Sequence, residues 1–313
     1  MTIVVDMSTM CRNFLVEKDD LKGMRALREF IVIVSRTPYI ARREHLLERL
    51  DLLDKLDAII GHLDSSDLTN SRDACVISLA RTLSSRLEAA NEDLYEAIRS
   101  EIVLHGSSSS LRHWLLHPAG YGDLGHPHFG LGFDLRDEIL SGVLQLREPS
   151  RTELPRSLDM VPYQPTPVRH ILDLAEGCCP SNDDVFIDLG SGLGHVPLLI
   201  SLLLGIRTLG VERQPSYVSS AQECVRRLNL ERVQFVAEDA RLADLSGGTI
   251  FYLFSPFTGV ILTDVLDRLR MESIKKQIKI CSLGPCTHAL AGQTWLSPNI
   301  VPDARRITVF ASR

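Results

Sequence analysis

The sequence has no long apolar run, which argues against a membrane-spanning helix. The longest apolar stretches are residues 30–34 and 197–206, and Ser201 and Gly205 interrupt the second of them. Neither approaches the roughly 18 apolar residues that a helix needs to cross a bilayer. The first residues also lack a basic segment followed by a long apolar one, so we expect no signal peptide and no membrane partner.

The cysteines do not follow the pattern of a secreted disulfide framework. There are seven of them, an odd number, and no two have C-x-x-C spacing. Cys75, Cys224 and Cys281 lie in apolar segments, and Cys178 is adjacent to Cys179. We therefore expect reduced, buried thiols in a cytoplasmic protein.

A block of basic residues is missing as well. The chain carries 34 Lys and Arg against 40 Asp and Glu, a formal net charge of -6. Residues 1–110 hold 14 of the basic and 18 of the acidic residues, a net charge of -4, which leaves -2 for the remainder. Because nucleic-acid-binding surfaces are basic, we expect no nucleic-acid partner. The 44% of hydrophobic residues excludes disorder as the main state, and 313 residues suggest about two domains.

The N-terminal third of the sequence is typical of helices. Apolar residues recur at helical spacing in residues 21–36, 43–63 and 74–104. We therefore predict an all-helical domain over residues 1–110. Because such strongly one-sided helices need a partner surface, we expect them to pack on the rest of the chain or to form a homodimer, and to help close an acceptor pocket.

Residues 111–154 are predicted to form an ordered connector, because flexible linkers rarely carry this many aromatic side chains. A short amphipathic helix is expected over residues 134–146. Four histidines fall within sixteen residues, at positions 113, 117, 126 and 128. We expect no metal there, since no Cys or Glu completes a tetrahedral set, and we expect His126 to contribute to an acceptor pocket.

From residue 155 onward the pattern changes to alternating strands and helices. Short β-branched or aromatic runs lie at residues 185–190, 208–212, 233–239, 249–254, 278–284 and 306–311. Helical segments separate several of them, at residues 196–204, 215–229 and 259–273. This alternation predicts an α/β domain over residues 155–313, with a Rossmann-like sheet covered by helices on both faces.

A glycine-rich turn follows the first predicted strand. Gly190, Gly192 and Gly194 stand at alternate positions between the strand and a helix. Glycines let a ligand approach the backbone, and the helix N-terminus offers free N–H groups. The spacing differs from the G-x-G-x-x-G of dinucleotide sites, and Asp188 precedes the first glycine by two residues. A carboxylate would repel a pyrophosphate but attract an ammonium group.

Two further carboxylates follow the next two predicted strands. Glu212 ends the second strand and can accept both hydroxyls of a ribose. Asp239 follows the third strand and can accept the amine of adenine. A ligand with an ammonium, a ribose and an adenine, but no phosphate, is S-adenosylmethionine. We therefore expect S-adenosylmethionine as the cofactor and no metal.

The sequence at these positions resembles a known family. The run D-L-G-S-G-L-G-H-V from Asp188 onward, followed by G-V-E at residues 210–212, is similar to the class I, Rossmann-like S-adenosylmethionine-dependent methyltransferases. Within them it is most similar to the non-SET lysine methyltransferases of the disruptor-of-telomeric-silencing type. Those enzymes also carry a Y-x-x-T element that contacts the cofactor, and Tyr163 and Thr166 match it here. The resemblance covers residues 155–313 and implies a seven-stranded sheet.

The resemblance and the residue analysis together predict the site. The residues expected to bind the cofactor are Tyr163, Thr166, Asp188, Gly190, Ser191, Gly192, Gly194, His195, Glu212, Arg213, Asp239, Ala240 and Phe254. Those expected to take part in catalysis are Ser255, Phe257 and His126.

Two departures from the family pattern stand out. His195 replaces an amide side chain of the lysine enzymes, and we expect it to contact the methionine carboxylate. Residues 254–257 read Phe-Ser-Pro-Phe where nitrogen methyltransferases often have Asp/Asn-Pro-Pro-aromatic. We expect Ser255 to orient the acceptor nitrogen and Phe257 to wall its pocket.

The sequence leaves three functions open. The first is methylation of a nitrogen or oxygen of a small molecule, for example in secondary metabolism, which the acidic charge and the helical domain favour. The second is protein-lysine methylation, which the glycine loop favours and the missing basic block disfavours. The third is a non-catalytic cofactor-binding module, although such a module has little reason to keep Asp188, Glu212 and Asp239.

Overall fold

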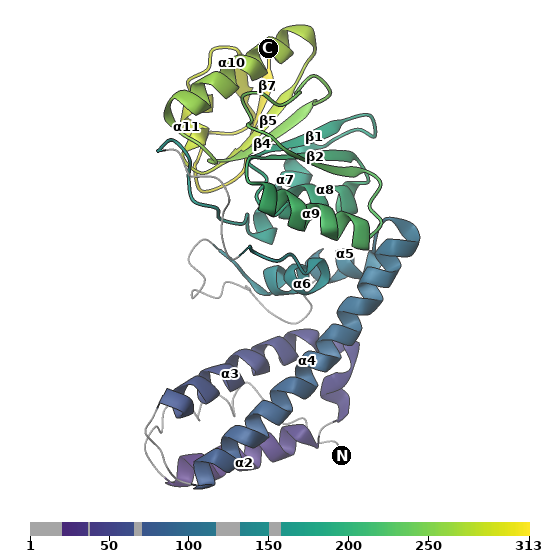
Figure 1. Cartoon of the computed structure of the whole chain (residues 1–313), viewed down its shortest axis with the longest axis vertical. Helices are drawn as coiled ribbons and strands as arrows, with labels where there is room; N and C mark the ends of the chain where they lie inside the picture. The colour runs from purple at the N-terminus through teal and green to yellow at the C-terminus, as the bar shows by residue number, and fades with distance from the viewer. Residues whose placement is uncertain (1–20, 37, 66–70, 117–131, 150–157) are drawn as a thin grey trace. The chain divides into compact units, whose positions relative to one another are not determined.

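The computed structural model describes five stretches of the chain, residues 21–36, 38–65, 71–116, 132–149 and 158–313 (Figure 1). The chain divides into two compact units, Met1–Glu96 and Ala97–Arg313. Helix α4 crosses this division. The domain limits predicted from the sequence, at residues 110 and 154, stay predictions.

The first unit is helical over its described residues. Its helices are α2 (Leu21–Ser35), η1 (Pro38–Ala41), η2 (Arg43–His45), α3 (Leu46–Ser65) and most of α4 (Ser71–His105). An apolar cluster that includes Phe30, Ile31, Leu56 and Leu87 joins α2, α3 and α4. The fully buried Arg49 donates hydrogen bonds to Asn91 and to the carbonyls of Ile40 and Arg42, which offset part of the cost of burying its charge. The helical character predicted for this region is confirmed over its described residues.

The second unit is built on a seven-stranded sheet. Its strands are β1 (Val185–Leu189), β2 (Arg207–Glu212), β3 (Val233–Ala237), β4 (Ile250–Phe254), β5 (Lys279–Leu283), β6 (Leu296–Pro298) and β7 (Thr308–Ser312). Their order across the sheet is β3-β2-β1-β4-β5-β7-β6. Strands β1 to β5 run parallel, whereas β7 is antiparallel to both of its neighbours. The α/β sheet predicted from the sequence is confirmed.

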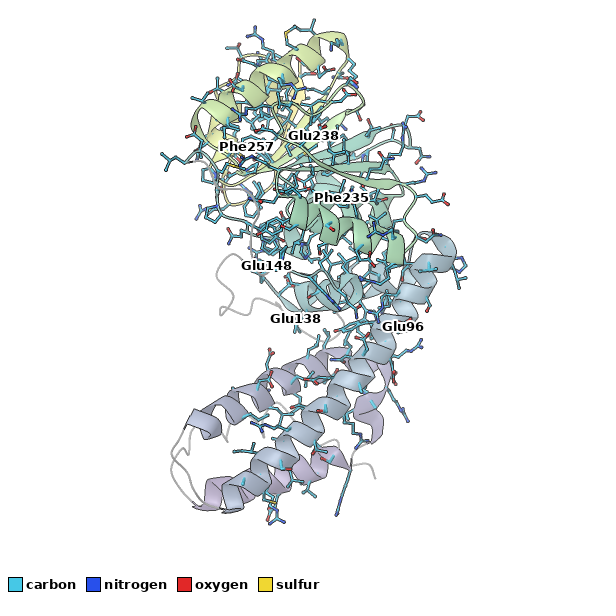
Figure 2. All side chains as sticks on the ribbon, viewed as in Figure 1. Glu96, Glu138, Glu148, Phe235, Glu238 and Phe257 are labelled. Atoms are coloured by element: carbon cyan, nitrogen blue, oxygen red, sulfur yellow. The ribbon has the colours of Figure 1, made fainter. Side chains whose placement is uncertain are left out.

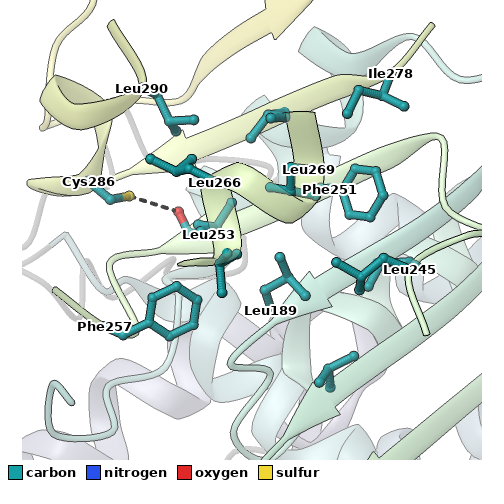
Figure 3. Packing of buried hydrophobic residues seen from close by; sticks show 14 of the residues in the cluster. Leu189, Leu245, Phe251, Leu253, Phe257, Leu266, Leu269, Ile278, Cys286 and Leu290 are labelled. Atoms are coloured by element: carbon teal, nitrogen blue, oxygen red, sulfur yellow. Dashed lines mark hydrogen bonds between the residues drawn. The ribbon is translucent and has the colours of Figure 1, made fainter. Parts of the chain in front are cut away.

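Helices cover both faces of this sheet, as the alternating pattern predicts (Figure 1). One face is covered by α7 (Val168–Cys178), α8 (His195–Leu204) and α9 (Pro215–Arg227). On the other face α10 (Gly259–Lys275) and α11 (Cys286–Ala291) pack on β1, β4 and β5 through one apolar cluster (Figure 3). Two shorter helices, α5 (Ser109–Leu116) and α6 (Leu135–Leu144), precede the sheet.

The register of the parallel strands places their ends together. Asp188 on β1 pairs with Gly210 on β2 and with Tyr252 on β4. Because β1 to β5 are parallel, their carboxyl ends meet at one edge of the sheet, where ligands bind in open α/β folds. The glycine loop, Glu212, Asp239 and Ser255 therefore converge on this edge.

Candidate functional site

A pocket of about 620 Å³ lies at the carboxyl edge of the sheet. Its walls come from the segment before α7, the loops after β1 to β5, and the starts of α8, α9, α10 and α11. Its size is typical of pockets that hold one small ligand or cofactor. Figure 2 labels two of its residues, Glu238 after β3 and Phe257 after β4.

The glycine loop between β1 and α8 is fixed by its backbone and by close neighbours. Gly190, Gly192 and Gly194 have φ values of +90°, +52° and +89°, a region that favours glycine. The N–H groups of Gly190 and Ser191 both donate to the carbonyl of Val211 on β2. A Cβ atom on Gly190 would stand 2.3 Å from Pro256, and one on Gly194 would stand 2.4 Å from Phe235. The alternate glycines thus allow the loop to pack tightly at the pocket floor.

Asp188 is an acid buried without a neutralising charge among its described neighbours. It lines the pocket and is 4% exposed. Burial and, to a lesser degree, the negative charge of Glu212 raise the pKa of Asp188 well above its usual range. A cation bound in the pocket would relieve this cost, which is the interaction that an ammonium group offers.

Glu212, at the end of β2, supports the loop as well as the pocket. One carboxylate oxygen accepts the Gly192 N–H at 3.0 Å, and the other accepts the Gln214 N–H at 2.8 Å. An ionised carboxylate has about four lone-pair sites. Glu212 can therefore accept two ribose hydroxyls while it holds both amides.

Asp239 is tied to an arginine beside it. Its carboxylate accepts the backbone N–H and two guanidinium bonds of Arg241, at 2.8–3.0 Å. These bonds, foremost the side-chain ones, hold the pKa of Asp239 below its usual range, so it is ionised at neutral pH. The unused lone pairs of its carboxylate can accept an adenine amine.

Tyr163 and His195 meet above the glycine loop. The Tyr163 hydroxyl lies 3.3 Å from Nδ1 of His195, and its ring lies 5.1 Å from the ring of Tyr217. Burial lowers the pKa of His195 to about 4, so its imidazole is neutral at pH 7. His195 opens α8 and lines the pocket, and a neutral ring can donate from one nitrogen only.

Residues 158–166, which we name the strap, close the pocket from one side. Met160 forms an antiparallel bridge with Phe257, and the Val161 N–H donates to the Pro256 carbonyl at 3.1 Å. At its other end the Thr166 hydroxyl lies 3.2 Å from the hydroxyl of the fully buried Tyr252. The strap is therefore anchored to the turn after β4 and to β4 itself.

The turn after β4 is strained and firmly held. Ser255 has φ +43°, a conformation that non-glycine residues rarely adopt. Its hydroxyl donates to the Leu283 carbonyl at 3.2 Å and accepts the Cys286 N–H at 2.9 Å. Phe257 is 4% exposed and packs at the edge of the cluster under α10 (Figure 3).

The structure brings most of the residues predicted from the sequence to this one pocket. Those that line it are Tyr163, Thr166, Asp188, Gly190, Ser191, His195, Glu212, Arg213, Asp239, Ala240, Phe254, Ser255 and Phe257. Gly192 and Gly194 lie in the loop behind the wall, and His126 lies outside the described residues. The roles assigned to all of them stay predictions.

Several lining residues were not predicted from the sequence. Met160, Val161, Tyr217, Tyr252 and Cys286 line the pocket. Tyr252 lies in the apolar run 250–254, where nothing in the pattern says which side chains reach a ligand. Val161 begins the proline-rich run 161–167 and Met160 directly precedes it, and this run was the available signal for a wall at this place.

The histidine-rich connector is described only in part. His113 is exposed on α5 and makes an edge contact with Trp114, while the other three histidines lie outside the described residues. Within the described ranges there is no group of three or more His, Cys, Asp or Glu that could hold a metal. No described helix is long and apolar enough to cross a membrane.

The residues of the pocket fit S-adenosylmethionine. The buried Asp188 needs a positive group, Glu212 and Asp239 offer further acceptors, and the hydroxyl of Ser191 is buried without a hydrogen-bond partner among the described atoms. The loop after β1 has no room for further side chains, as a site of close backbone approach requires.

Comparisons with known proteins give short or distant matches. No family model matches the chain. A probable protein-L-isoaspartate O-methyltransferase of Dictyostelium discoideum is 35% identical over 74 residues, which is 22% of this chain and 23% of that protein. The chain thus matches less than a quarter of the length of this curated relative.

Two solved structures are similar to part of the chain. An RNA methyltransferase from Salinibacter ruber in complex with S-adenosyl-L-homocysteine has 23% identity and a TM-score of 0.38, covering 48% of this chain and 92% of that one. The putative methyltransferase yhhF from Escherichia coli has 14% identity and a TM-score of 0.40. The match covers 46% of this chain and 86% of that one. We assign the fold from the strand order β3-β2-β1-β4-β5-β7-β6 and the antiparallel β7. On these grounds the chain has the fold of the class I S-adenosylmethionine-dependent methyltransferases.

Proposed function

We propose that the unit Ala97–Arg313 binds S-adenosylmethionine and transfers its methyl group to a nitrogen or oxygen of a small molecule. The observation that carries this proposal is the buried carboxylate of Asp188, whose pKa is raised by burial and by Glu212. A ligand that carries two cationic groups, an ammonium and a sulfonium, stabilises such a pair of acids. Phosphate-bearing dinucleotides would be repelled by it.

Each carboxylate has a separate task in this proposal. Asp188 would hold the ammonium, Glu212 the ribose hydroxyls and Asp239 the adenine amine. The strap and the turn after β4 exclude water from the space beside them. Transfer between aligned groups needs chiefly this positioning and a dry, charge-matched pocket.

When bound, S-adenosylmethionine supplies an electrophilic methyl group on a positive sulfur. The lone pair of the acceptor atom forms the new bond to the methyl carbon while the carbon–sulfur bond breaks and its electron pair stays on sulfur. The acceptor then loses a proton to water. A neutral amine needs no base for this reaction, whereas a hydroxyl needs one. The hydroxyl of Ser255 already bonds two backbone groups, so it supports the turn in addition to any contact with the acceptor.

The test is calorimetric titration of the full-length protein with S-adenosyl-L-homocysteine, which has the same ammonium, ribose and adenine. We expect a dissociation constant in the micromolar range, about -8 kcal/mol. Asp188→Asn should weaken binding at least tenfold, because a neutral amide replaces the charged partner of the ammonium. Asp183→Asn, at an exposed position just before β1, is the matched control and should bind as the native protein does. Absence of binding by the full-length protein would overturn the proposal.

The acceptor is then sought by incubation with S-adenosylmethionine and mixtures of small molecules, with detection of S-adenosyl-L-homocysteine. A small-molecule acceptor is supported by the net charge of -6, which disfavours a nucleic-acid acceptor. A cytoplasmic location is part of the same proposal and is supported by the six described cysteines, all of which are free thiols.

One observation favours a second function, protein-lysine methylation. The Tyr163 ring packs on the glycine loop, the Thr166 hydroxyl lies beside that of Tyr252, and both residues of the Y-x-x-T element line the pocket. Methyl transfer to mixed protein substrates, with no transfer to small molecules, would favour it. Tight binding of S-adenosyl-L-homocysteine with no transfer to either class would favour the non-catalytic module instead.

A further inference from the structure

Charged side chains are confined to one part of the pocket wall. They come from the ends of β1, β2 and β3, and they are Asp188, Glu212, Arg213, Glu238, Asp239 and Arg241. All three carboxylates assigned to the cofactor belong to this set. We name this part the charged wall.

Another part of the pocket wall has a different composition. It is formed by residues 160–162 of the strap, 254–258 after β4, 261–262 of α10 and 285–286 at the start of α11, and we name it the apolar wall. None of these residues is Asp, Glu, Lys, Arg or His. Its apolar side chains include Met160, Val161, Phe257, Ile261 and Leu262.

The polar side chains of the apolar wall are largely committed elsewhere. The Ser255 hydroxyl donates to Leu283 and accepts from the Cys286 N–H. The Cys286 thiol is directed to the carbonyls of Leu253 and Leu283, and burial raises its pKa, so it stays neutral (Figure 3). The wall therefore offers an acceptor no charged side chain, and its available polar side chain is the hydroxyl of Thr258, which makes no cap hydrogen bond to α10.

Two charged residues flank the apolar wall, and both are directed to other groups. The Arg213 guanidinium lies 3.4 Å from the Met160 sulfur and, after Arg241, helps to lower the pKa of Asp239. The Asp159 carboxylate lies at the start of α10, where it fills the space beside Gly259. Arg213 thus marks the border between the two walls.

The apolar surface continues outward at the rim. Val161 in the strap lines the pocket and is 43% exposed. The strap pairs with residues 256–258, which directly precede α10. An apolar ligand seated beside the strap would bury the exposed part of Val161.

We propose that the apolar wall binds an uncharged acceptor with a largely apolar body, such as an aromatic amine or phenol. This inference rests on the proposed function, because it assigns the charged wall to the cofactor. An apolar acceptor gains from leaving water, whereas a phosphate or an ammonium would be buried there without a partner. An RNA segment would also need Lys or Arg for its phosphates, and the only such residues among the described lining residues are Arg213, which lies beside Met160, and Arg241, which is bound to Asp239.

The probes are 1-naphthylamine and 4-amino-1-naphthalenesulfonate, which share one ring system and differ by one negative charge. Their fluorescence is titrated with the full-length protein saturated with S-adenosyl-L-homocysteine. We expect 1-naphthylamine to bind at least tenfold more tightly than the sulfonate. Adenosine monophosphate should not compete with it.

Substitutions at the rim locate the bound probe. Val161→Asp should weaken 1-naphthylamine binding at least fivefold, and Val161→Lys should strengthen sulfonate binding, because each places a charge beside the ring. Val161 is partly exposed and its contacts with residues 256–258 are made by the backbone, so both variants should fold. Ile274→Asp, at the far end of α10 and 73% exposed, is the matched control and should change neither affinity.

The outcomes separate this inference from the proposed function. Failure of S-adenosyl-L-homocysteine to bind overturns both. Normal binding of it, together with equal or tighter binding of the sulfonate, overturns the apolar acceptor and leaves the proposed function intact. Unchanged binding of both probes by the two Val161 variants would likewise overturn the inference, because the probe would then occupy another surface.

Discussion

The ring of Tyr163 fills the space that a side chain on Gly192 would occupy. A Cβ atom built on Gly192 would stand 2.1 Å from a ring carbon of Tyr163. The strap and the glycine loop are therefore complementary in shape. Glycine is required at position 192 both because the Tyr163 ring occupies the space of a side chain and because the backbone is left-handed there.

Gly192→Ala tests this contact. The new methyl group would sit on a residue with left-handed backbone, φ +52°, and would displace the ring of Tyr163. Gly205→Ala is the matched control, since Gly205 has φ +67° and no atom within 4 Å of its Cβ position. The control should lose about 1–2 kcal/mol of unfolding free energy from the backbone alone. Gly192→Ala should lose at least ~1 kcal/mol more and bind S-adenosyl-L-homocysteine more weakly. Equal losses in urea denaturation would mean that Tyr163 moves aside freely.

Glu212 is expected to bind the ribose and to hold the loop at the same time. Glu212→Ala removes charge-assisted hydrogen bonds, each contributing about 1.5–3 kcal/mol, so calorimetric affinity for S-adenosyl-L-homocysteine should fall at least tenfold. Glu212→Gln keeps one acceptor oxygen, so its affinity for S-adenosyl-L-homocysteine should lie between that of the alanine variant and that of the native protein. Glu231→Ala, an exposed position before β3, serves as control. Unchanged affinity of the alanine variant would remove the ribose assignment.

Asp188 is expected to lower the free energy of unfolding of the protein when no ligand is bound. Its pKa in the folded protein lies above the unfolded value of about 4, so the folded state binds more protons and loses stability as pH rises from about 4 through the folded pKa. Asp188→Asn should therefore raise the free energy of unfolding at pH 8 by at least ~1 kcal/mol, with a smaller gain at pH 5. Urea denaturation at the two pH values measures this difference. A variant less stable than the native protein at pH 8 would contradict the assignment of an uncompensated buried acid.

Ser255 combines backbone strain with a hydroxyl that links two turns. Ser255→Ala keeps φ +43° and leaves the Cys286 N–H and the Leu283 carbonyl without this partner, which should cost about 1–3 kcal/mol of unfolding free energy. Ser255→Gly loses the same bonds but relieves the strain, so it should be less destabilised. If the alanine variant were the more stable of the two, strain at this residue would be excluded. A loss of transfer rate at unchanged stability would instead support contact of the hydroxyl with the acceptor.

The sequence predicts the sheet and the carboxylates well, for a physical reason. Buried parallel strands are short, rich in β-branched residues and separated by helices, so a sequence pattern identifies them. The residues at their carboxyl ends lie together at one edge of the sheet, because the strands are parallel. Asp188, Glu212 and Asp239 could therefore be placed together before their contacts were known. The three-residue strand β6 and the short helix α11 were not predicted, because so few residues carry no periodicity.

The side-chain contacts within the site could not be predicted from a sequence pattern. That Ser255 is held by the turn after β5, or that Tyr163 reaches His195, depends on tertiary packing between segments 28 to 32 residues apart. The division of the pocket into a charged and an apolar wall follows from the same packing. The unit boundary at Glu96 falls inside α4, where a continuous helical pattern gives no signal.

Truncation tests which helices the sheet needs. Hydrogen bonds join the helices before residue 150 to one another and to the helices that cover the sheet. The Arg99 guanidinium donates to the Gly142 carbonyl on α6 at 2.8 Å, Asp137 accepts the Val168 N–H of α7 at 2.9 Å, and Arg227 of α9 donates to the carbonyl of Leu144. A chain that begins at residue 97 retains all of these, whereas a chain that begins at residue 150 loses them together with the apolar faces of α5 and α6.

We therefore expect the chain from residue 97 to unfold cooperatively and to bind S-adenosyl-L-homocysteine within about threefold of the full-length affinity, a difference below ~1 kcal/mol. The chain from residue 150 should fold poorly and bind weakly, because buried side chains such as Ile139 and Leu144 no longer cover their partners. Circular dichroism and calorimetry measure both properties. If the chain from residue 97 transfers methyl groups at the full-length rate, the expectation that the N-terminal helices help close the acceptor pocket is wrong. If the chain from residue 150 is stable and binds S-adenosyl-L-homocysteine tightly, α5 and α6 are dispensable for the cofactor site.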